Sequence, residues 1–125
     1  MRTIQITAGD VTATATLNDS ATASALWDAL PISARANTWG EEIYFAIPVY
    51  QEQAADAKEI VTVGDLGYWP PGHAFCIFFG RTPVSRGNEI RPASAVNVIG
   101  RVDGDATVFK RVTDGARVLL AKADG

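Results

Sequence analysis

Hydrophobic and polar residues alternate with a period of two at the start of the chain. Thr3–Ala8 and Val11–Leu17 both follow this alternation, and Gly9-Asp10 between them is a pair that favours a tight turn. Because successive strand side chains point to opposite faces, each segment presents one apolar face. The sequence therefore predicts an opening β-hairpin.

The spacing then becomes helical. Between residues 21 and 30, Ala, Leu and Trp recur on one face, Asn18-Asp19-Ser20 precede the segment as N-cap candidates, and Pro31 ends it. We expect one short amphipathic helix here. Trp27 lies on its apolar face, which indicates a packing role rather than contact with a ligand.

Alternation returns in residues 32–39 and, after an interruption at Gly40, in residues 41–47. The side chains expected to face the core are Ile43, Phe45 and Ile47. Glu42 and Tyr44 would then share the opposite face. Adjacent Glu41 and Glu42 cannot both face one pocket from a regular strand, so a pair of catalytic carboxylates would require another acid such as Asp65.

The rest of the chain also reads as short strands separated by turns. Strands are predicted at residues 59–63, 74–79, 95–102 and 116–121, and a second short helix at 106–112. The continuous apolarity of 74–79 indicates burial on both faces. Loops are predicted at 51–58 and 80–92, a turn at 64–65, and a rigid aromatic bend at 68–72.

About eight short strands with two short helices indicate a mainly β fold, closed or nearly closed into a barrel, which removes exposed sheet edges. A sandwich is the alternative. With 125 residues, 47% of them hydrophobic and 20% charged, the chain suits one domain spanning residues 1–125.

Composition also limits which cellular compartment and which classes of partner are expected. No apolar run approaches the roughly 18 residues that span a bilayer, and no signal-peptide pattern opens the chain, so we expect a cytoplasmic protein without a membrane partner. The net charge of −3 divides into −6 for residues 1–80 and +3 for residues 81–125. Because the basic residues of the second part are mostly single, a nucleic-acid partner is not expected.

The common catalytic and cofactor motifs are missing from the sequence. His73 is the one histidine and Cys76 the one cysteine, a pair too small for a transition-metal site, and Cys76 lies in an apolar run that predicts a buried structural thiol. The sequence has no Gly-x-Ser-x-Gly elbow, no Gly-x-Gly-x-x-Gly and no Gly-Lys-Ser/Thr. No metal or cofactor is therefore predicted.

Two segments, 37–45 and 64–72, are dense in aromatic residues beside carboxylates. Such residues supply the apolar walls and the few directional polar groups of a ligand pocket. The candidate ligand-binding residues are Trp39, Glu42, Tyr44, Tyr68, Trp69, Phe78 and Asn97. The alternative is that the aromatic side chains plug the ends of the barrel, as barrels require whatever their function.

Four stretches carry a family resemblance. They are Asn-Thr-Trp-Gly-Glu-Glu-Ile-Tyr-Phe (37–45), Gly-Asp-Leu-Gly-Tyr-Trp-Pro-Pro-Gly (64–72), Cys-Ile-Phe-Phe-Gly-Arg-Thr-Pro (76–83) and Pro-Ala-Ser-Ala-Val-Asn-Val-Ile-Gly (92–100). In these stretches the sequence resembles a family of small prokaryotic proteins of uncharacterised function with a cyclophilin-like fold, represented by a Thermotoga protein. The resemblance implies an eight-stranded barrel with two short helices.

The same resemblance bears on activity. True cyclophilins isomerise X-Pro bonds with an arginine followed closely by a Phe-Met-x-Gln pattern. Arg35 lies on a comparable early strand, but Trp39-Gly40-Glu41-Glu42 follows it. Cyclophilin-like barrels also occur in subunits resembling those of 5-oxoprolinase and allophanate hydrolase, which implies amide or small-carboxylate chemistry as a remote option.

Three functions follow for testing. The first is a binding module for a small molecule or an extended peptide, without prolyl isomerase activity. The second is a weak or divergent prolyl isomerase with Arg35 as its catalytic group. The third is a structural or interaction subunit, with loop 80–92 as an oligomer contact.

Overall fold

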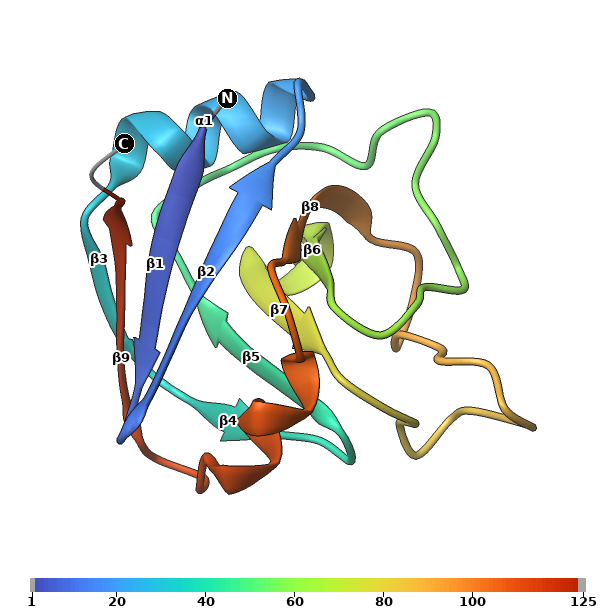
Figure 1. Ribbon diagram of the computed structural model, residues 1–125. Coiled ribbons are helices and arrows are strands. Elements are labelled where there is room, and N and C mark those ends of the chain that lie inside the picture. Colours follow the sequence, from blue (N-terminus) through green and yellow to red (C-terminus); the bar gives the residue numbers. More distant parts are fainter. Residues whose placement is uncertain (1, 124–125) are drawn as a thin grey trace.

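One antiparallel sheet dominates the computed structural model, which describes residues 2–123. The sheet has nine strands in the described residues, in the order β3-β9-β1-β2-β8-β6-β7-β5-β4 (Figure 1). The elements along the chain are β1 (Thr3–Ala8), β2 (Val11–Leu17), α1 (Ala21–Ala29), β3 (Ile32–Arg35), β4 (Asn37–Thr38), β5 (Glu42–Ala46), β6 (Asp65–Trp69), the 3₁₀ turn η1 (Pro70–Gly72), β7 (Ala74–Phe78), β8 (Asn97–Val102), the 3₁₀ helix η2 (Ala106–Arg111) and β9 (Arg117–Lys122).

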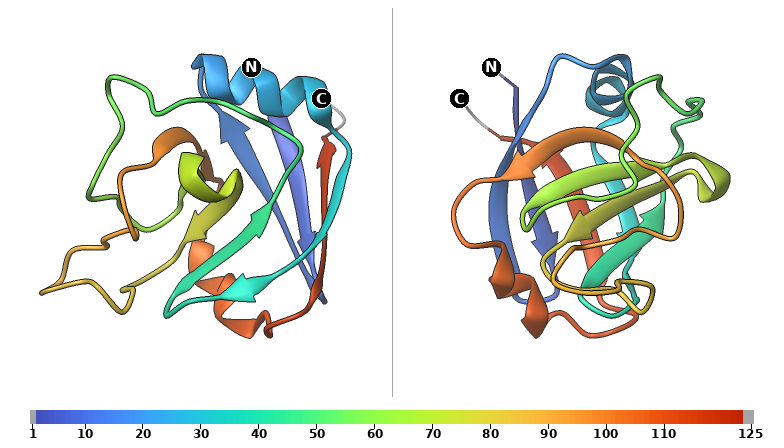
Figure 2. Two further views of the ribbon diagram at one scale, coloured as in Figure 1. Left: turned by 180° about the vertical axis from the view of Figure 1, so that it is seen from behind. Right: turned by 90° about the vertical axis from the view of Figure 1, so that its right-hand side faces the viewer.

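The two edge strands of this sheet, β3 and β4, are consecutive in the chain. Ala36 joins them, its N–H donating to the carbonyl of Ala116 at 2.8 Å and its carbonyl accepting from the N–H of Gly115 at 2.7 Å. The sheet thus wraps around on itself into a nearly closed barrel (Figure 2). This confirms the predicted mainly β barrel.

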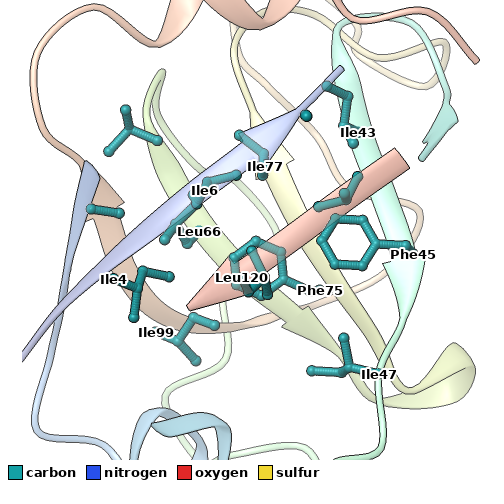
Figure 3. Close-up of a cluster of buried hydrophobic side chains, with 14 of the residues drawn as sticks. Ile4, Ile6, Ile43, Phe45, Ile47, Leu66, Phe75, Ile77, Ile99 and Leu120 are labelled. Carbon is teal, nitrogen blue, oxygen red and sulfur yellow. The ribbon is translucent and has the colours of Figure 1, made fainter. Parts of the chain in front are cut away.

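Side chains fill the interior of the barrel. Ile43 and Phe45 point inward from β5, as predicted, and meet residues from the other strands (Figure 3). The ring of Phe45 stacks on that of Phe75 with centroids 5.2 Å apart. Close packing of this kind makes the interior a core rather than a ligand cavity.

Helical segments cover the two ends of the barrel (Figure 1). Ser20 caps the N-terminus of α1, where its hydroxyl accepts the N–H of Ala23, and the helix buries Leu26 against the core. Trp27 packs against the same core, and the charges of Arg2 and Lys122 lie 5.8 and 4.8 Å from its ring centroid. Its packing role is therefore confirmed. At the opposite end η2 buries Phe109.

One predicted strand is wrong and another was missed. Residues 59–63 form only an isolated bridge, between Val61 and Ile90, and Ile60 is 50% exposed, so this stretch is a covering loop. The strand that the sequence did not predict is β6, where the pattern indicated a turn and an aromatic bend. Gly67 at its centre hides the alternation: the strand passes so close to Val96 that an added Cβ would lie 3.0 Å from that side chain.

A second apolar cluster lies outside the barrel, on the outer face of β5, β6, β7 and β8. Residues 48–64 and 79–96 form two long connections beside this face (Figure 1). They bury outward-facing side chains of the strands, which explains why every residue of β7 is buried, as its continuous apolarity predicted. The buried members of this outer cluster are Val61, Ala74, Cys76, Phe78, Ile90 and Val96.

Within residues 2–123, no helix has the length and apolar character needed to cross a membrane.

Candidate functional site

A small pocket lies between the outer face of the barrel wall and residues 92–96. Its volume is about 130 Å³, and it is partly open to the surface. An engineered protein cavity of about 150 Å³ accepts benzene, so this pocket suits a group of comparable size. The lining residues are Trp39, Glu42, Tyr44, Trp69, Cys76, Pro92, Ala93 and Val96.

Glu42 is the charged residue in this lining. The alternation of β5 places Ile43 and Phe45 in the core and sends Glu42 and Tyr44 to the outer face, as the sequence predicted. Glu42 is only 5% exposed, and its Oε1 atom has no hydrogen-bond partner among the described residues. A buried carboxylate oxygen without a partner costs free energy, so this position is costly for the fold to maintain.

Burial changes the acidity of this site. It raises the pKa of Glu42 from 4.5 to about 7, while a hydrogen bond from the neighbouring Cys76 thiol acts in the opposite direction. Burial, followed by the negative charge of Glu42, raises the pKa of Cys76 well above its usual value. The pocket therefore combines a carboxyl group that can exchange its proton near neutral pH with a thiol that stays protonated.

The two tryptophans of the pocket are fixed by hydrogen bonds of different kinds. The backbone N–H of Trp39 donates to the carbonyl of Glu42 at 3.0 Å, which closes the turn between β4 and β5. The indole Nε1 of Trp69 donates to Ser94 Oγ at 2.6 Å. Trp69 thus connects the barrel wall to the segment that covers the pocket.

The covering segment is held by local hydrogen bonds. Ser85 Oγ accepts the backbone N–H of Thr82 and of Arg91, each at 3.1 Å. Glu89 accepts the N–H groups of Arg86 and Gly87, and these bonds lower the pKa of Glu89 to about 2. Such bonds give a strand-free loop a defined shape beside the pocket.

The structure brings together four of the seven predicted ligand-binding residues. Trp39, Glu42, Tyr44 and Trp69 all line the pocket. Phe78 lies in the outer cluster with the pocket residues Cys76 and Val96 but is not part of the lining. These aromatics lie on the outer wall, so they do not plug the ends of the barrel.

Tyr68 and Asn97 are placed elsewhere. Tyr68 points into the core, where its hydroxyl donates to the carbonyl of Val49 at 2.6 Å. Asn97 is buried, accepts the N–H of Ala54 at 2.7 Å and donates to Thr22 Oγ1 at 3.0 Å. Both side chains therefore fasten the loop that follows β5, and neither lines the aromatic pocket.

Three other residues with proposed chemistry also lie outside the pocket lining. Arg35 is exposed on β3, and its Nη1 donates to the carbonyl of Gly115 at 3.2 Å. Asp65 forms an ion pair with Arg101 at 2.8 Å and does not line the pocket, so it does not supply the second acid that a two-carboxylate mechanism would require there. His73 is an exposed turn residue with a φ of 48°, as expected from its position after Pro-Pro-Gly.

Sequence reasoning missed part of the lining: Cys76, Pro92, Ala93 and Val96. For Cys76 the signal was present, because it lies two positions from Ala74 and from Phe78 and must share their outward face. Pro92 and Ala93 follow no periodic pattern, and Val96 lies at the start of the strand predicted at 95–102, where its packing on the pocket was not foreseen. Within residues 2–123, no cluster of three or more metal-ligating side chains occurs.

A family model described as Cyclophilin-like matches residues 2–121 of the chain. The chain belongs to the cyclophilin-like family. A solved structure, the solution structure of the hypothetical protein AF2241 from Archaeoglobus fulgidus, is 42% identical, with a TM-score of 0.83 over 98% of this chain and 95% of that chain. No curated protein shows a significant match.

These comparisons confirm the resemblance stated from the sequence and the barrel that it implied. The cyclophilin-like protein and its archaeal relative share a fold, but neither the family description nor the name of the relative states an activity. Because one fold supports many functions, the function of this member has to be inferred from its pocket.

Proposed function

We propose that this cyclophilin-like protein is a binding module that takes a small molecule, or one side group of a peptide, into the pocket on the outer wall of its barrel. The observation that carries the proposal is the buried carboxylate of Glu42, which lacks a partner at Oε1 and lines a pocket with three aromatic residues. A ligand that satisfies this oxygen recovers part of the cost of burying it.

The same pocket supports binding better than proline isomerisation. Its lining holds no arginine, and the Arg35 guanidinium donates to the carbonyl of Gly115 instead. Trp39-Gly40-Glu41-Glu42 also stands where the isomerase pattern Phe-Met-x-Gln would follow. No group in the lining is therefore suited to polarise the nitrogen of an X-Pro bond.

Tryptophan fluorescence provides a direct test. Trp39 and Trp69 line the pocket, whereas Trp27 lies on α1 and packs against the barrel core, so the tryptophan emission of a Trp27→Phe protein comes from the pocket alone. We expect at least one member of a panel of small amines, amides, carboxylic acids and X-Pro peptides to change this emission saturably. The same compound should raise the melting temperature, because a ligand of the folded state stabilises it.

Two matched variants locate the binding. Ala93 is exposed at the pocket, so Ala93→Phe should fill the opening and weaken binding at least tenfold without loss of folding. Ala55→Phe, at an exposed position in the other loop, should bind as the parent does. A panel that moves neither signal, or equal binding by the Ala93→Phe protein, would contradict the proposal.

A further inference from the structure

The pocket contains one side chain that can carry a formal charge, Glu42, and within residues 2–123 it forms no ion pair. Two charged residues next to lining residues in the sequence are already paired: Glu41 with Lys110 at 3.2 Å, and Arg91 with Glu89 at 3.3 Å. None of these four lines the pocket, and neither does any lysine or arginine. When Glu42 is ionised, its charge therefore has no counter-ion within the lining.

The walls around this charge favour one sign of ligand. Trp39, Tyr44 and Trp69 present aromatic rings, whose faces attract cations, and a carboxylate between such rings strengthens the attraction. The Trp69 N–H already donates to Ser94. The side-chain oxygens of the lining belong to the Glu42 carboxyl group and the Tyr44 hydroxyl. The carboxylate oxygens of Glu42, the Tyr44 hydroxyl oxygen and the three rings can accept a cation, whereas the lining holds no lysine, arginine or histidine to pair with an anion.

On the basis of the binding role proposed above, we propose that the pocket takes a small organic cation, an alkylammonium or quaternary ammonium group, that pairs with Glu42 between the rings of Trp39, Tyr44 and Trp69. The volume of about 130 Å³ matches such a head group. A larger ligand would place this group in the pocket and leave its remainder at the surface.

Proton release follows from this assignment. The carboxyl group of Glu42 has a pKa of about 7 in the free protein, and a bound cation favours its ionised form, so binding expels a proton near neutral pH. The other titratable groups of the lining are the Cys76 thiol, with its pKa raised well above the usual value, and the Tyr44 phenol. The residues contributed by the covering segment, Pro92, Ala93 and Val96, carry no titratable side chain.

The size of the pH effect follows from the ionised fraction. With a pKa of about 7, Glu42 is about one-tenth ionised at pH 6 and about nine-tenths ionised at pH 8. A ligand that binds only the ionised form has an apparent affinity proportional to that fraction. The dissociation constant should therefore fall about tenfold from pH 6 to pH 8.

Choline and its neutral isostere 3,3-dimethyl-1-butanol are the probes, titrated into the Trp27→Phe protein at constant ionic strength and followed by fluorescence. We expect choline to bind saturably with a dissociation constant at or below about 10 mM at pH 8. The neutral isostere should bind at least tenfold more weakly. Calorimetry in buffers of different ionisation enthalpy should show about one proton released per choline at pH 6.

Glu42→Gln and Glu41→Gln are the paired variants. Glu42→Gln should lose the preference for choline and its pH dependence, whereas Glu41→Gln, at the surface ion pair with Lys110, should keep both. Equal binding of choline and its isostere, insensitive to Glu42→Gln, would overturn the cation assignment while leaving a binding pocket. If choline does not bind and the panel compounds that do bind are all uncharged or anionic, the cation assignment is likewise overturned. If neither choline nor any panel compound binds, the proposed function is overturned as well.

Discussion

Replacing Glu42 by Gln tests whether the folded protein holds this carboxyl group in a desolvated state. Below pH 4.5 the group is protonated in both the folded and the unfolded chain. Between pH 4.5 and 7 the unfolded chain has lost the proton and the folded protein has kept it, so the free energy of unfolding falls as the pH rises. Above pH 7 both states are ionised and the loss is complete.

The magnitude follows from the difference between the two pKa values. A raised pKa of about 7 against 4.5 corresponds to a total loss of roughly 3 kcal/mol, at about 1.4 kcal/mol per pKa unit. About 2.5 kcal/mol of this loss occurs between pH 5 and pH 8.5, a range in which the protein is convenient to study. For a domain of this size that equals a shift in melting temperature of roughly 10 °C.

The assay is urea unfolding of the parent and of Glu42→Gln at several pH values. We expect the two free energies of unfolding to diverge by about 2.5 kcal/mol across the range, with the variant becoming the relatively more stable protein as the pH rises. Contributions from titratable groups common to both proteins cancel in the difference. Glu41→Gln, a change at a half-exposed surface pair, should follow the parent. Parallel curves for the parent and Glu42→Gln would refute the desolvated carboxyl.

Three further outcomes are expected. Gly100→Ala should lower the free energy of unfolding by more than about 3 kcal/mol, because its Cβ would lie 2.3 Å from the Thr16 carbonyl oxygen. Gly87→Ala, whose Cβ would lie 3.5 Å from its nearest neighbour, should change the free energy of unfolding by less than about 1 kcal/mol. Similar losses in the two variants would contradict this interpretation. A protease-coupled assay should give the uncatalysed rate of prolyl isomerisation, and acceleration that is lost in Arg35→Ala would show the second hypothesis to be right. The buried Cys76 thiol should react with Ellman's reagent only after unfolding, and rapid reaction of the native protein would disprove its burial.

Most of the correct predictions from the sequence came from the alternation of hydrophobic and polar residues along strands. The opening hairpin, α1 and the two faces of β5 all follow from local periodicity, and the outward placement of Glu42 and Tyr44 follows from the same rule. Periodicity failed at β6, where Gly67 carries no side chain to mark a face and Pro70 suggested a bend. That failure also misplaced Tyr68, because its inward direction depends on recognising the strand.

The part of the pocket formed by residues 92–96 could not be predicted from the sequence. The segment with Pro92 and Ala93 is held at the barrel wall by the bond from Trp69 to Ser94 and by Ser85, which binds Thr82 and Arg91, and Val96 is held by backbone bonds to Lys58. These are contacts between positions without a repeating pattern. The raised pKa of Glu42 is likewise a property of its surroundings, since the same residue on an uncovered strand would be solvated.

The division of the pocket between strand residues and a strand-free segment has a consequence for how its specificity can change. Glu42, Tyr44 and Cys76 lie on strands whose opposite face fills the barrel, so altering that wall puts the core packing at risk. Ala93 and its neighbours belong to a connection that contributes no strand to the sheet. A laboratory library can therefore vary this segment on an unchanged barrel, which would show how far it sets the selectivity of the proposed binding.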